Sequence, residues 1–361
     1  MKVLFIVPYP TEGPSNRYRV EQYLPFLEEH GICCRLRPFI TSKFYRILYF
    51  KGNKLKKCIY FLTSCIKRLT DIIRAVNYDI IFVHIEAFPF GPPLFELIFY
   101  LMGKPIIFDF EDAIYLPSPN KENIFRWLRF PKKFYLNIGL SRHVLVCNNY
   151  LKKKLHSYNP DITVIPTCID TDKFKLKTNK TSNDNLSIGW IGSHTTSSCL
   201  KQITPVLQKL AKKYKFTLKI VGGGNEIEIP GIKVINEKWS IEKDVENFQS
   251  LDIGVYPLPD NEWAMAKTPF KTIQYMSVGV PTVASGVGGN REIIQDGING
   301  FLASNEEEWI EKLSLLIEKP ELRQKLGMAG RKTVEEMYSL KINAPRFLEV
   351  LLKVYNEKYG K

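Results

Sequence analysis

The segment KTPFKTIQYM (residues 267–276) places two lysines around the start of an apolar helix. Lys267 comes just before Pro269, which suits the first position of a helix, and Lys271 falls in the first turn. A cation there opposes the helix macrodipole at a cost of at most about 1 kcal/mol. We expect a bound anion to offset that cost; an ordinary pair of solvated lysines is the alternative. Gln274 shares a face with Lys271, and its amide can both donate to and accept from sugar hydroxyls.

A second group of chemically capable residues is acidic and follows an apolar run. The segment FDFEDAIYL (108–116) carries Asp109, Glu111 and Asp112 where the expected strand 105–109 ends. Three carboxylates at the end of a buried strand are costly unless they are solvated or paired. They can bind the hydroxyl groups of a substrate or act as a general base. Capping of the next segment is the alternative without a chemical role.

Two further strand ends in the same half carry polar side chains. VHIEAFPFG provides His84 and Glu86, although a lone histidine is more often structural. The first strand runs into YPTEGPSNRYR, where Gly13 and Arg17 are placed to meet a phosphate group. A plain loop is the alternative for this glycine-proline-serine stretch.

Three turns at strand ends in the second half can present backbone N–H groups to an anion. They are Gly-Ser-His-Thr-Thr (192–196), three glycines (222–224) and Gly-Val-Gly-Gly-Asn (286–290). Each turn by itself can serve only to reverse the chain, but three in one half favour a ligand that bears phosphate. None fits GxGxxG after the first strand or GxxxxGK[ST], so neither a dinucleotide enzyme nor a P-loop enzyme is favoured.

Short apolar strands alternate with helical stretches and position these residues. The expected strands are 3–7, 32–37, 79–84, 105–109, 143–147, 162–165, 186–192, 216–224, 232–236, 252–258 and 281–285. One helix is expected at 16–29, and long helices at about 304–318, 320–337 and 340–358. β-branched runs separated by helices predict parallel α/β sheets, which bind ligands outside the carboxyl ends of their strands. The polar stretch 170–185 has the composition of a linker between two such domains.

Composition limits the class of protein. The chain has 361 residues, of which 45% are hydrophobic, as in an ordinary globular protein of about two domains. Its seven cysteines form no CxxC pair or Cys/His cluster with zinc spacing, so we expect reduced thiols in the cytoplasm and no metal. The N-terminal apolar run is short and ends at Pro8, which argues against a signal peptide, and no run of about 18 apolar residues predicts a membrane span.

The net charge of +14 is concentrated in one region. Residues 35–74 hold eleven basic residues and a single acid, Asp71. Within residues 42–76 the cations alternate with aromatic and aliphatic side chains, which is typical of amphipathic helices on anionic membranes. We therefore predict contact with a membrane surface; a helix with a solvated basic face is the plain alternative. The same composition suits nucleic acid, but no nucleic-acid motif accompanies it, so we do not expect that partner.

Five segments, together with YPTEGPSNRYR and FDFEDA, form a recognisable set. They are VIPTCIDTDKF (164–174), IGWIGS (188–193), DIGVYPLPD (252–260), PFKTIQYMSVGVPTVAS (269–285) and GGNREIIQDGINGFL (288–302). This set resembles the family 4 glycosyltransferases with the GT-B fold. The resemblance implies two Rossmann-like domains with the active site in the cleft between them. It also implies retention of anomeric configuration, no metal or cofactor, and a nucleotide-sugar donor held mainly by the C-terminal domain.

The last helix of such proteins typically crosses back to the first domain. The resemblance therefore implies an acceptor-binding domain at 1–168, a nucleotide-sugar-binding domain at 169–339, and a helix at 340–361 that packs on the first domain.

The chain departs from the family at residues that carry its chemistry. Many members have two glutamates eight positions apart, which fall on Ala266 and Gln274, and the segment is similar instead to a subgroup with P-x-K-x-x-[EQ]-Y-M. The second glutamate usually holds the nucleotide ribose, a role that Gln274 can fill as a neutral partner. The family's Arg and Lys that bind the diphosphate are missing from the turn 193–196, so Lys267 and Lys271 are expected to replace them.

The resemblance assigns roles to the residues named above. Glu111 falls on the place of a family histidine beside the reacting sugar, and Glu292 matches the family glutamate after the glycine turn. The implied catalytic residues are Glu111, Asp112 and Lys271. The implied acceptor-binding residues are His84, Glu86, Asp109 and Glu111. The implied donor-binding residues are Gly13, Arg17, Ser193, His194, Lys267, Lys271, Gln274, Gly288, Gly289, Asn290 and Glu292.

The sequence therefore predicts a retaining glycosyltransferase of surface polysaccharide or glycoconjugate assembly. Its donor would be a UDP- or GDP-linked sugar, and its acceptor a glycan or a lipid-phosphate-linked glycan. We expect it in the cytoplasm, peripheral on the inner face of the cell membrane. The alternatives are a nucleotide-sugar epimerase of the same fold, and a non-catalytic binder of anionic membrane or nucleic acid with a degenerate transferase fold.

Overall fold

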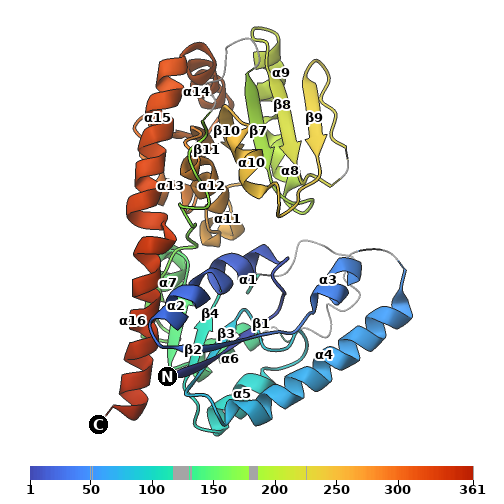
Figure 1. Ribbon diagram of the computed structural model, residues 1–361. Coiled ribbons are helices and arrows are strands. Elements are labelled where there is room, and N and C mark those ends of the chain that lie inside the picture. Colours follow the sequence, from blue (N-terminus) through green and yellow to red (C-terminus); the bar gives the residue numbers. More distant parts are fainter. Residues whose placement is uncertain are drawn as a thin grey trace. The chain divides into compact units, whose positions relative to one another are not determined.

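The structure is a computed structural model that describes residues 1–48, 50, 52–116, 130, 132–178, 186–224 and 226–360. The chain forms two compact units: unit 1 is Met1–Thr167 with Asn343–Lys361, and unit 2 is Cys168–Ile342. Each unit contains a six-stranded sheet in which all neighbouring strands are parallel (Figure 1). The predicted architecture of two doubly wound α/β units is confirmed.

The sheet of unit 1 has the strand order β2-β1-β3-β4-β5-β6. Its strands are β1 (Lys2–Val7), β2 (Cys33–Pro38), β3 (Ile80–His84), β4 (Ile106–Asp109), β5 (His143–Val146) and β6 (Ile162–Val164). The direction of winding reverses between β1 and β3. In open α/β sheets, ligands bind outside the carboxyl ends of the strands at such a switch point.

Helices surround this sheet. They are α1 (Pro14–Arg19), α2 (Leu24–Glu29), α3 (Ser42–Leu48), α4 (Lys54–Ala75), α5 (Leu94–Leu101), α6 (Lys133–Leu140) and α7 (Asn149–Leu155), joined by part of α16 (Leu340–Tyr359). The single helix expected at 16–29 is wrong: α1 and α2 are separate, because Pro25 has no backbone N–H to continue a helix and instead occupies the first turn of α2. Phe347 of α16 stacks on Tyr23 with ring centroids 4.5 Å apart, so the last helix completes the core of unit 1.

The sheet of unit 2 has the order β12-β11-β10-β7-β8-β9, with its switch point between β7 and β10. Its strands are β7 (Ser187–Ile191), β8 (Thr217–Val221), β9 (Lys233–Glu237), β10 (Ile253–Tyr256), β11 (Thr282–Ser285) and β12 (Phe301–Ala303). Strand β12 is not among the predicted strands, because three residues without a β-branched side chain give no strand pattern.

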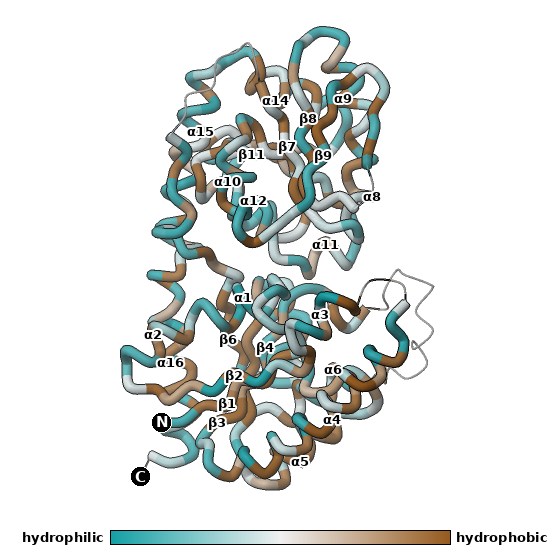
Figure 2. Tube along the Cα trace, turned by 45° about the vertical axis from the view of Figure 1, so that its right-hand side comes forward, coloured by the Kyte–Doolittle hydropathy of each residue, from teal (hydrophilic) through white to brown (hydrophobic). Residues whose placement is uncertain are grey.

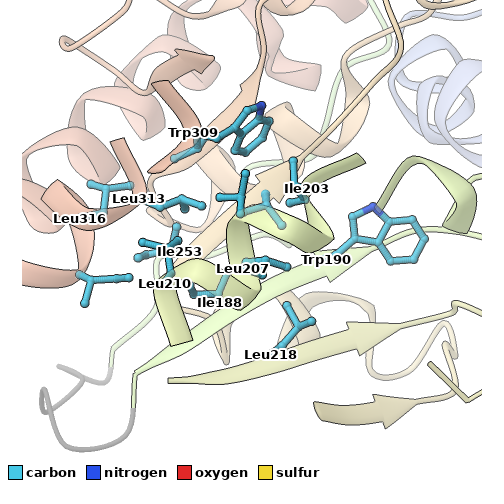
Figure 3. Close-up of a cluster of buried hydrophobic side chains, with 14 of the residues drawn as sticks. Ile188, Trp190, Ile203, Leu207, Leu210, Leu218, Ile253, Trp309, Leu313 and Leu316 are labelled. Atoms are coloured by element: carbon cyan, nitrogen blue, oxygen red, sulfur yellow. The ribbon is translucent and has the colours of Figure 1, made fainter. Parts of the chain in front are cut away.

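The helices of unit 2 bury their apolar faces on this sheet. They are α8 (Ser197–Leu200), α9 (Thr204–Ala211), α10 (Asp244–Gln249), α11 (Glu262–Ala266), α12 (Phe270–Ser277), α13 (Asn290–Ile293), α14 (Glu306–Glu318) and α15 (Pro320–Thr333), which continues into a π-helical turn (Val334–Tyr338). Figure 3 shows Leu207 of α9 and Leu313 of α14 packed around Ile188 and Ile253 of the sheet. This core fixes the strands at whose carboxyl ends the candidate ligand residues lie.

Helix α12 is attached to the sheet by Tyr275. Its ring lies so close to Gly254 of β10 that a Cβ at residue 254 would be 2.6 Å from Tyr275 Cγ. The Tyr275 hydroxyl accepts a hydrogen bond from the backbone N–H of Ile191 at 2.9 Å and donates to the Gly189 carbonyl at 3.3 Å. Burial raises the pKa of Tyr275, so the phenol keeps the proton that it donates. Helix α12 is thereby held against β7 and β10, on the two sides of the switch point.

Substitution of Gly254 by alanine tests this close approach. We expect Gly254→Ala to lower the free energy of unfolding by about 1–3 kcal/mol, because the new methyl group overlaps the Tyr275 ring. Gly139→Ala is the matched control, since no heavy atom lies within 4 Å of a Cβ there and alanine favours helix α6 by about 0.5–1 kcal/mol. Urea unfolding followed by circular dichroism measures both. A Gly254→Ala protein as stable as the wild type would contradict the described contact.

Candidate functional site

The glycine turn 286–290 of unit 2 packs against the junction of α11 and α12. A Cβ on Gly288 would lie 2.3 Å from the Ala264 carbonyl oxygen, and a Cβ on Gly289 would lie 2.6 Å from Pro269 Cδ. Gly288 also has a φ of 51°, in the region that favours glycine. Only glycine fits at either position, and the turn therefore comes next to the segment that carries Lys267 and Lys271.

Lys271 and Gln274 form a hydrogen-bonded pair on α12. Lys271 Nζ donates to Gln274 Oε1 at 2.8 Å and lies 5.3 Å from the ring centroid of Phe248. Gln274 is only 1% exposed, whereas Lys271 is half-buried. A neutral amide holds the ammonium group without cancelling its charge. A glutamate at position 274 would instead neutralise it. The aromatic face of Phe248 adds a second favourable contact for the cation.

Lys267 lies at the end of the preceding helix. It caps the C-terminus of α11, and its Nζ is 4.8 Å from the Trp263 ring. The helix that follows begins at Phe270, one residue later than predicted, and Pro269 is its N-cap instead of its first helical residue. Both predicted cations are thus held by local contacts on consecutive helices beside the glycine turn.

Asn290 has a different position from the one expected of a donor-binding residue. Its side chain is buried; Oδ1 accepts from Thr272 Oγ1 at 2.9 Å, and Nδ2 donates to the Ser285 carbonyl at 3.0 Å. Asn290 therefore joins the glycine turn to α12 instead of facing a ligand. Glu292 is exposed on α13. Burial, and secondarily the charge of Glu292, raise the pKa of Tyr338 to about 12.

The turn after β7 is exposed and holds its hydroxyls in a local network. Ser193 Oγ lies 2.7 Å from Thr195 Oγ1, and the Ser193 N–H donates to Thr196 Oγ1 at 3.2 Å. A Cβ on Gly224 would lie 2.7 Å from His194 Cβ, so the turns after β7 and β8 are in contact. Two of the three predicted turns therefore lie side by side at the carboxyl edge of the sheet.

In unit 1 a buried network joins the ends of β3 and β4 to α1. Both oxygens of Asp109 pair with the guanidinium of Arg19. His84 Nδ1 lies 2.6 Å from Asp109 Oδ2, and His84 Nε2 lies 2.8 Å from Ser15 Oγ. Burial alone would raise the pKa of Asp109, but Arg19 and His84 outweigh it and hold the pKa below its usual value. The carboxylate is therefore charged and fully compensated inside the unit.

This network revises the roles predicted for Asp109 and His84. Both side chains are 0% exposed, so in this structure they do not reach an acceptor. They hold Ser15, which is half-buried at the outer end of the chain of hydrogen bonds. The sequence analysis gave no role to Arg19, although a buried carboxylate at a strand end calls for a cationic partner.

The backbone is strained directly after both strands. Ile85 has a φ of 63° immediately after His84, and Asp112 has a φ of 63° in the loop after β4. A β-branched residue in this left-handed region is an outlier. Such conformations cost of the order of 1–3 kcal/mol and concentrate at functional sites. The strain marks this edge of the sheet as a candidate binding edge independently of the residue types.

Glu111 and Glu86 lie in the loops that follow these strands. Glu111 is half-buried, and its Oε2 accepts from Thr167 Oγ1 at 2.9 Å. Glu86 Oε2 lies 3.0 Å from Lys133 Nζ of α6. Each predicted acid is therefore oriented by a neighbour, a hydroxyl for Glu111 and a cation for Glu86.

Gly13 and Arg17 lie at α1, after β1. Gly13 caps the helix, and a Cβ there would be only 2.6 Å from Tyr9 Cβ. The Arg17 guanidinium donates to the Thr11 carbonyl at 3.3 Å and lies 5.0 Å from the ring centroid of Tyr18. The glycine is thus required by close packing, and the arginine is held at the helix surface.

No three or more His, Cys, Asp or Glu side chains of the described residues are grouped to hold a metal ion. Among the helices that can be described, none has the length and apolarity needed to cross a membrane.

Two family models match the chain. Residues 28–173 match Glycosyltransferase Family 4, and residues 186–319 match Glycosyl transferases group 1. Together with the two doubly wound units, these matches show that the chain belongs to the family 4 glycosyltransferases and has the GT-B fold.

Individual relatives match parts of the chain. The putative glycosyltransferase EpsD of Bacillus subtilis is 35% identical over 86 residues, which are 23% of this chain and 21% of that protein. The capsular polysaccharide biosynthesis glycosyltransferase CapM of Staphylococcus aureus is 23% identical over 200 residues, 52% of this chain and 50% of that protein. The chain thus spans about a fifth to a half of these curated relatives.

A solved structure matches almost the whole chain. HepE of Anabaena, in complex with UDP and glucose, has a TM-score of 0.65 at 14% identity, over 97% of this chain and 99% of that one. At this identity the likeness shows the shared fold alone.

Replacing Asp109 tests the buried network. We expect Asp109→Asn to cost about 3–5 kcal/mol of unfolding free energy, because it leaves Arg19 charged and buried without its carboxylate. The pKa of Asp109 falls on folding from its ordinary value of 3.8. The ionised carboxylate therefore stabilises the folded protein above pH 3.8, and this stabilisation is lost as the pH falls below that value. Urea unfolding at pH 7 and at pH 3 measures both effects.

Glu29→Gln is the control for the loss of one carboxylate, since Glu29 is exposed in the same unit. We expect it to change the unfolding free energy by less than about 0.5 kcal/mol. Equal effects of the two variants at pH 7 would contradict the buried ion pair.

Proposed function

We propose that the protein is a retaining glycosyltransferase that moves a sugar from a UDP- or GDP-linked donor to a glycan or a lipid-phosphate-linked glycan. The observation that carries this proposal is the arrangement around α12. There, a lysine oriented by a neutral amide and a second lysine on α11 lie beside a glycine turn that admits no side chain. The proposal assigns the donor to unit 2 and the acceptor to unit 1.

On the donor side, Lys271 and Lys267 would meet the diphosphate. Breaking the bond between the sugar and the phosphate leaves a nucleoside diphosphate on which negative charge grows. Fixed cations placed where the charge develops lower the barrier, because they need no reorganisation during the reaction. Lys271 therefore has the catalytic role, and Gln274, whose side chain is buried, positions the Lys271 ammonium group. Gly288 and Gly289 let the diphosphate approach the backbone.

The exposed hydroxyl of Ser193 and the side chain of His194 are assigned to the same ligand. They lie on the turn after β7, next to the switch point at which sheets of this kind bind nucleotides. Within unit 2, Glu292 is assigned to the donor sugar, and within unit 1, Gly13 and Arg17 are candidates for meeting a phosphate group.

On the acceptor side, Glu111 and Asp112 are assigned to the reacting groups. Glu111 is half-buried, and its Oε2 is oriented by Thr167, so a carboxylate is held ready to accept a hydrogen bond from a sugar hydroxyl. The Glu86 carboxylate is the second acceptor contact. Asp109, Arg19 and His84 act through their packing, because they hold α1 and the strained loops in place.

The names of similar proteins support the substrate classes. HepE was solved with UDP and glucose, so a UDP-sugar is the first donor to test. CapM is described as a capsular polysaccharide biosynthesis enzyme, which supports a role in surface polysaccharide assembly. We propose that the protein works in the cytoplasm on the inner face of the membrane, held there by residues 42–76.

Neutralising Lys271 tests the donor site. We expect Lys271→Met to bind UDP about 10- to 100-fold more weakly, since a charge-assisted hydrogen bond contributes roughly 1.5–3 kcal/mol. Sugar transfer should fall by at least the same factor. Isothermal titration with UDP and with GDP measures affinity and identifies the base, and release of the nucleotide measures turnover.

Lys325→Met is the matched control, because Lys325 is an exposed lysine of α15. Its affinity for UDP should equal that of the wild type. If Lys271→Met also kept wild-type affinity and turnover, the phosphate role of Lys271 would be wrong.

Product analysis separates the proposal from the two alternatives. A transferase consumes acceptor and gives one anomer, the same as in the donor, whereas an epimerase converts the nucleotide sugar with no acceptor present. A non-catalytic binder does neither. It also lacks the slow hydrolysis of the donor by water that a transferase shows without acceptor.

A further inference from the structure

Helix α4 turns its polar side chains inward and its aliphatic side chains outward. Ser64, Arg68, Asp71 and Ala75 are its buried residues. The opposite face carries seven aliphatic side chains that are 49–76% exposed: Leu55, Ile59, Leu62, Ile66, Leu69, Ile73 and Val76. An amphipathic helix on the surface of a soluble protein is normally arranged the other way round.

Buried ion pairs fix this orientation. Asp71 accepts hydrogen bonds from Arg37 of β2 and from Arg68, the latter at 3.0 Å. Arg68 also donates to the backbone carbonyls of Val7 and Arg37, each at 3.3 Å. Rotating α4 to hide its aliphatic face would break these contacts and leave buried charges unpaired, which is strongly unfavourable. The outward aliphatic face is therefore a stable feature of unit 1.

Helix α5 extends the same surface. It packs beside α4 and exposes Leu94, Leu97, Ile98, Tyr100 and Leu101. Figure 2 shows the hydrophobic colouring along both helices. About a dozen exposed apolar side chains on two adjacent helices exceed the scattered apolar residues of an ordinary surface, and mark a place that another apolar surface covers.

The charges around this surface indicate what covers it. Lys54, Lys56 and Arg74 are exposed on α4. The acids of the two helices, Asp71 and Glu96, are both buried. The described residues of α4 and α5 thus present cations and aliphatic side chains with no exposed carboxylate, which is the combination that an anionic lipid surface attracts.

A second copy of the chain fits this surface less well. The aliphatic residues alternate at spacings of four and three, as in a coiled-coil seam. The positions that flank such a seam normally carry opposite charges, but here they include Lys56, Cys58, Thr63 and Cys65. None of these four residues is acidic, so two copies would form no ion pair between them along the seam.

We infer that the aliphatic face of α4, continued by α5, inserts into an anionic lipid monolayer, with α4 lying in the membrane plane and its cations among the headgroups. The inference specifies how the protein binds the membrane of the proposed function. It rests on that proposal for the choice of the inner leaflet. Attachment by insertion differs from attachment by charge in its response to salt. At 1 M salt the Debye length is about 3 Å, so a purely electrostatic attachment is lost, whereas buried aliphatic surface still holds the protein.

Vesicle sedimentation of the full chain, without donor or acceptor, tests the inference. We expect binding to vesicles of phosphatidylcholine with 30% phosphatidylglycerol that weakens but persists at 1 M salt, and weaker binding to phosphatidylcholine alone. The double variant Leu62→Ser/Ile66→Ser should bind at least about 10-fold more weakly at both salt concentrations, because two inserted side chains are lost. Ile298→Ser is the matched control, since Ile298 is 59% exposed in unit 2; it should bind as the wild type does.

Several results would overturn the inference. The wild type could fail to bind vesicles, or 1 M salt could release it completely, or the double variant could bind like the wild type. A wild-type dimer in solution that Leu62→Ser/Ile66→Ser converts to monomers would assign the face to a second copy. UDP affinity of the same variants, measured without vesicles, keeps this outcome separate from a failure of the donor site.

Discussion

The contact between Tyr275 and Gly254 is the constraint on which the proposed donor site of unit 2 depends. Because residue 254 has no side chain, the Tyr275 ring reaches β10 and its hydroxyl reaches the backbone of β7. Helix α12 is then fixed beside the switch point of the sheet. Lys271 and Gln274 project from the first turns of that helix, and the glycine turn packs on its start. A change at the ring would therefore move the cation, the amide and the turn together.

The charged side chains Asp109 of unit 1 and Lys271 of unit 2 have different kinds of partners. Unit 1 compensates Asp109 fully, with Arg19 and His84 around it and no exposed surface. Unit 2 holds Lys271 with a neutral amide and an aromatic ring, contacts that orient the cation without neutralising it. The first arrangement stabilises the fold and the strained loops beside it. The second orients the Lys271 ammonium group on the first turn of α12, beside Gln274.

The strands of the α/β units could be predicted because runs of β-branched residues are a local signal, and the Lys271–Gln274 pair follows from helical spacing. Burial is not local. Ser15 and His84 are 69 positions apart, and Arg19 and Asp109 are 90 apart, so their network has no sequence signature. The same holds for α4: its amphipathic pattern was visible, but its inward face is set by Arg37 on a distant strand. The glycine turn by itself predicts Asn290 as a ligand residue, whereas its hydrogen-bond partner Thr272 lies on another helix and has no local signal.

Amide hydrogen exchange of the full chain, with and without saturating UDP, tests the donor assignment most directly. We expect slower exchange in peptides that cover 262–277 and 286–293, because the nucleotide orders α11, α12 and the glycine turn. Peptides that cover β4 and the acidic loop 106–116 should exchange at an unchanged rate when no acceptor is present. Protection confined to unit 1, with none at 262–277, would contradict the assignment of the donor to unit 2.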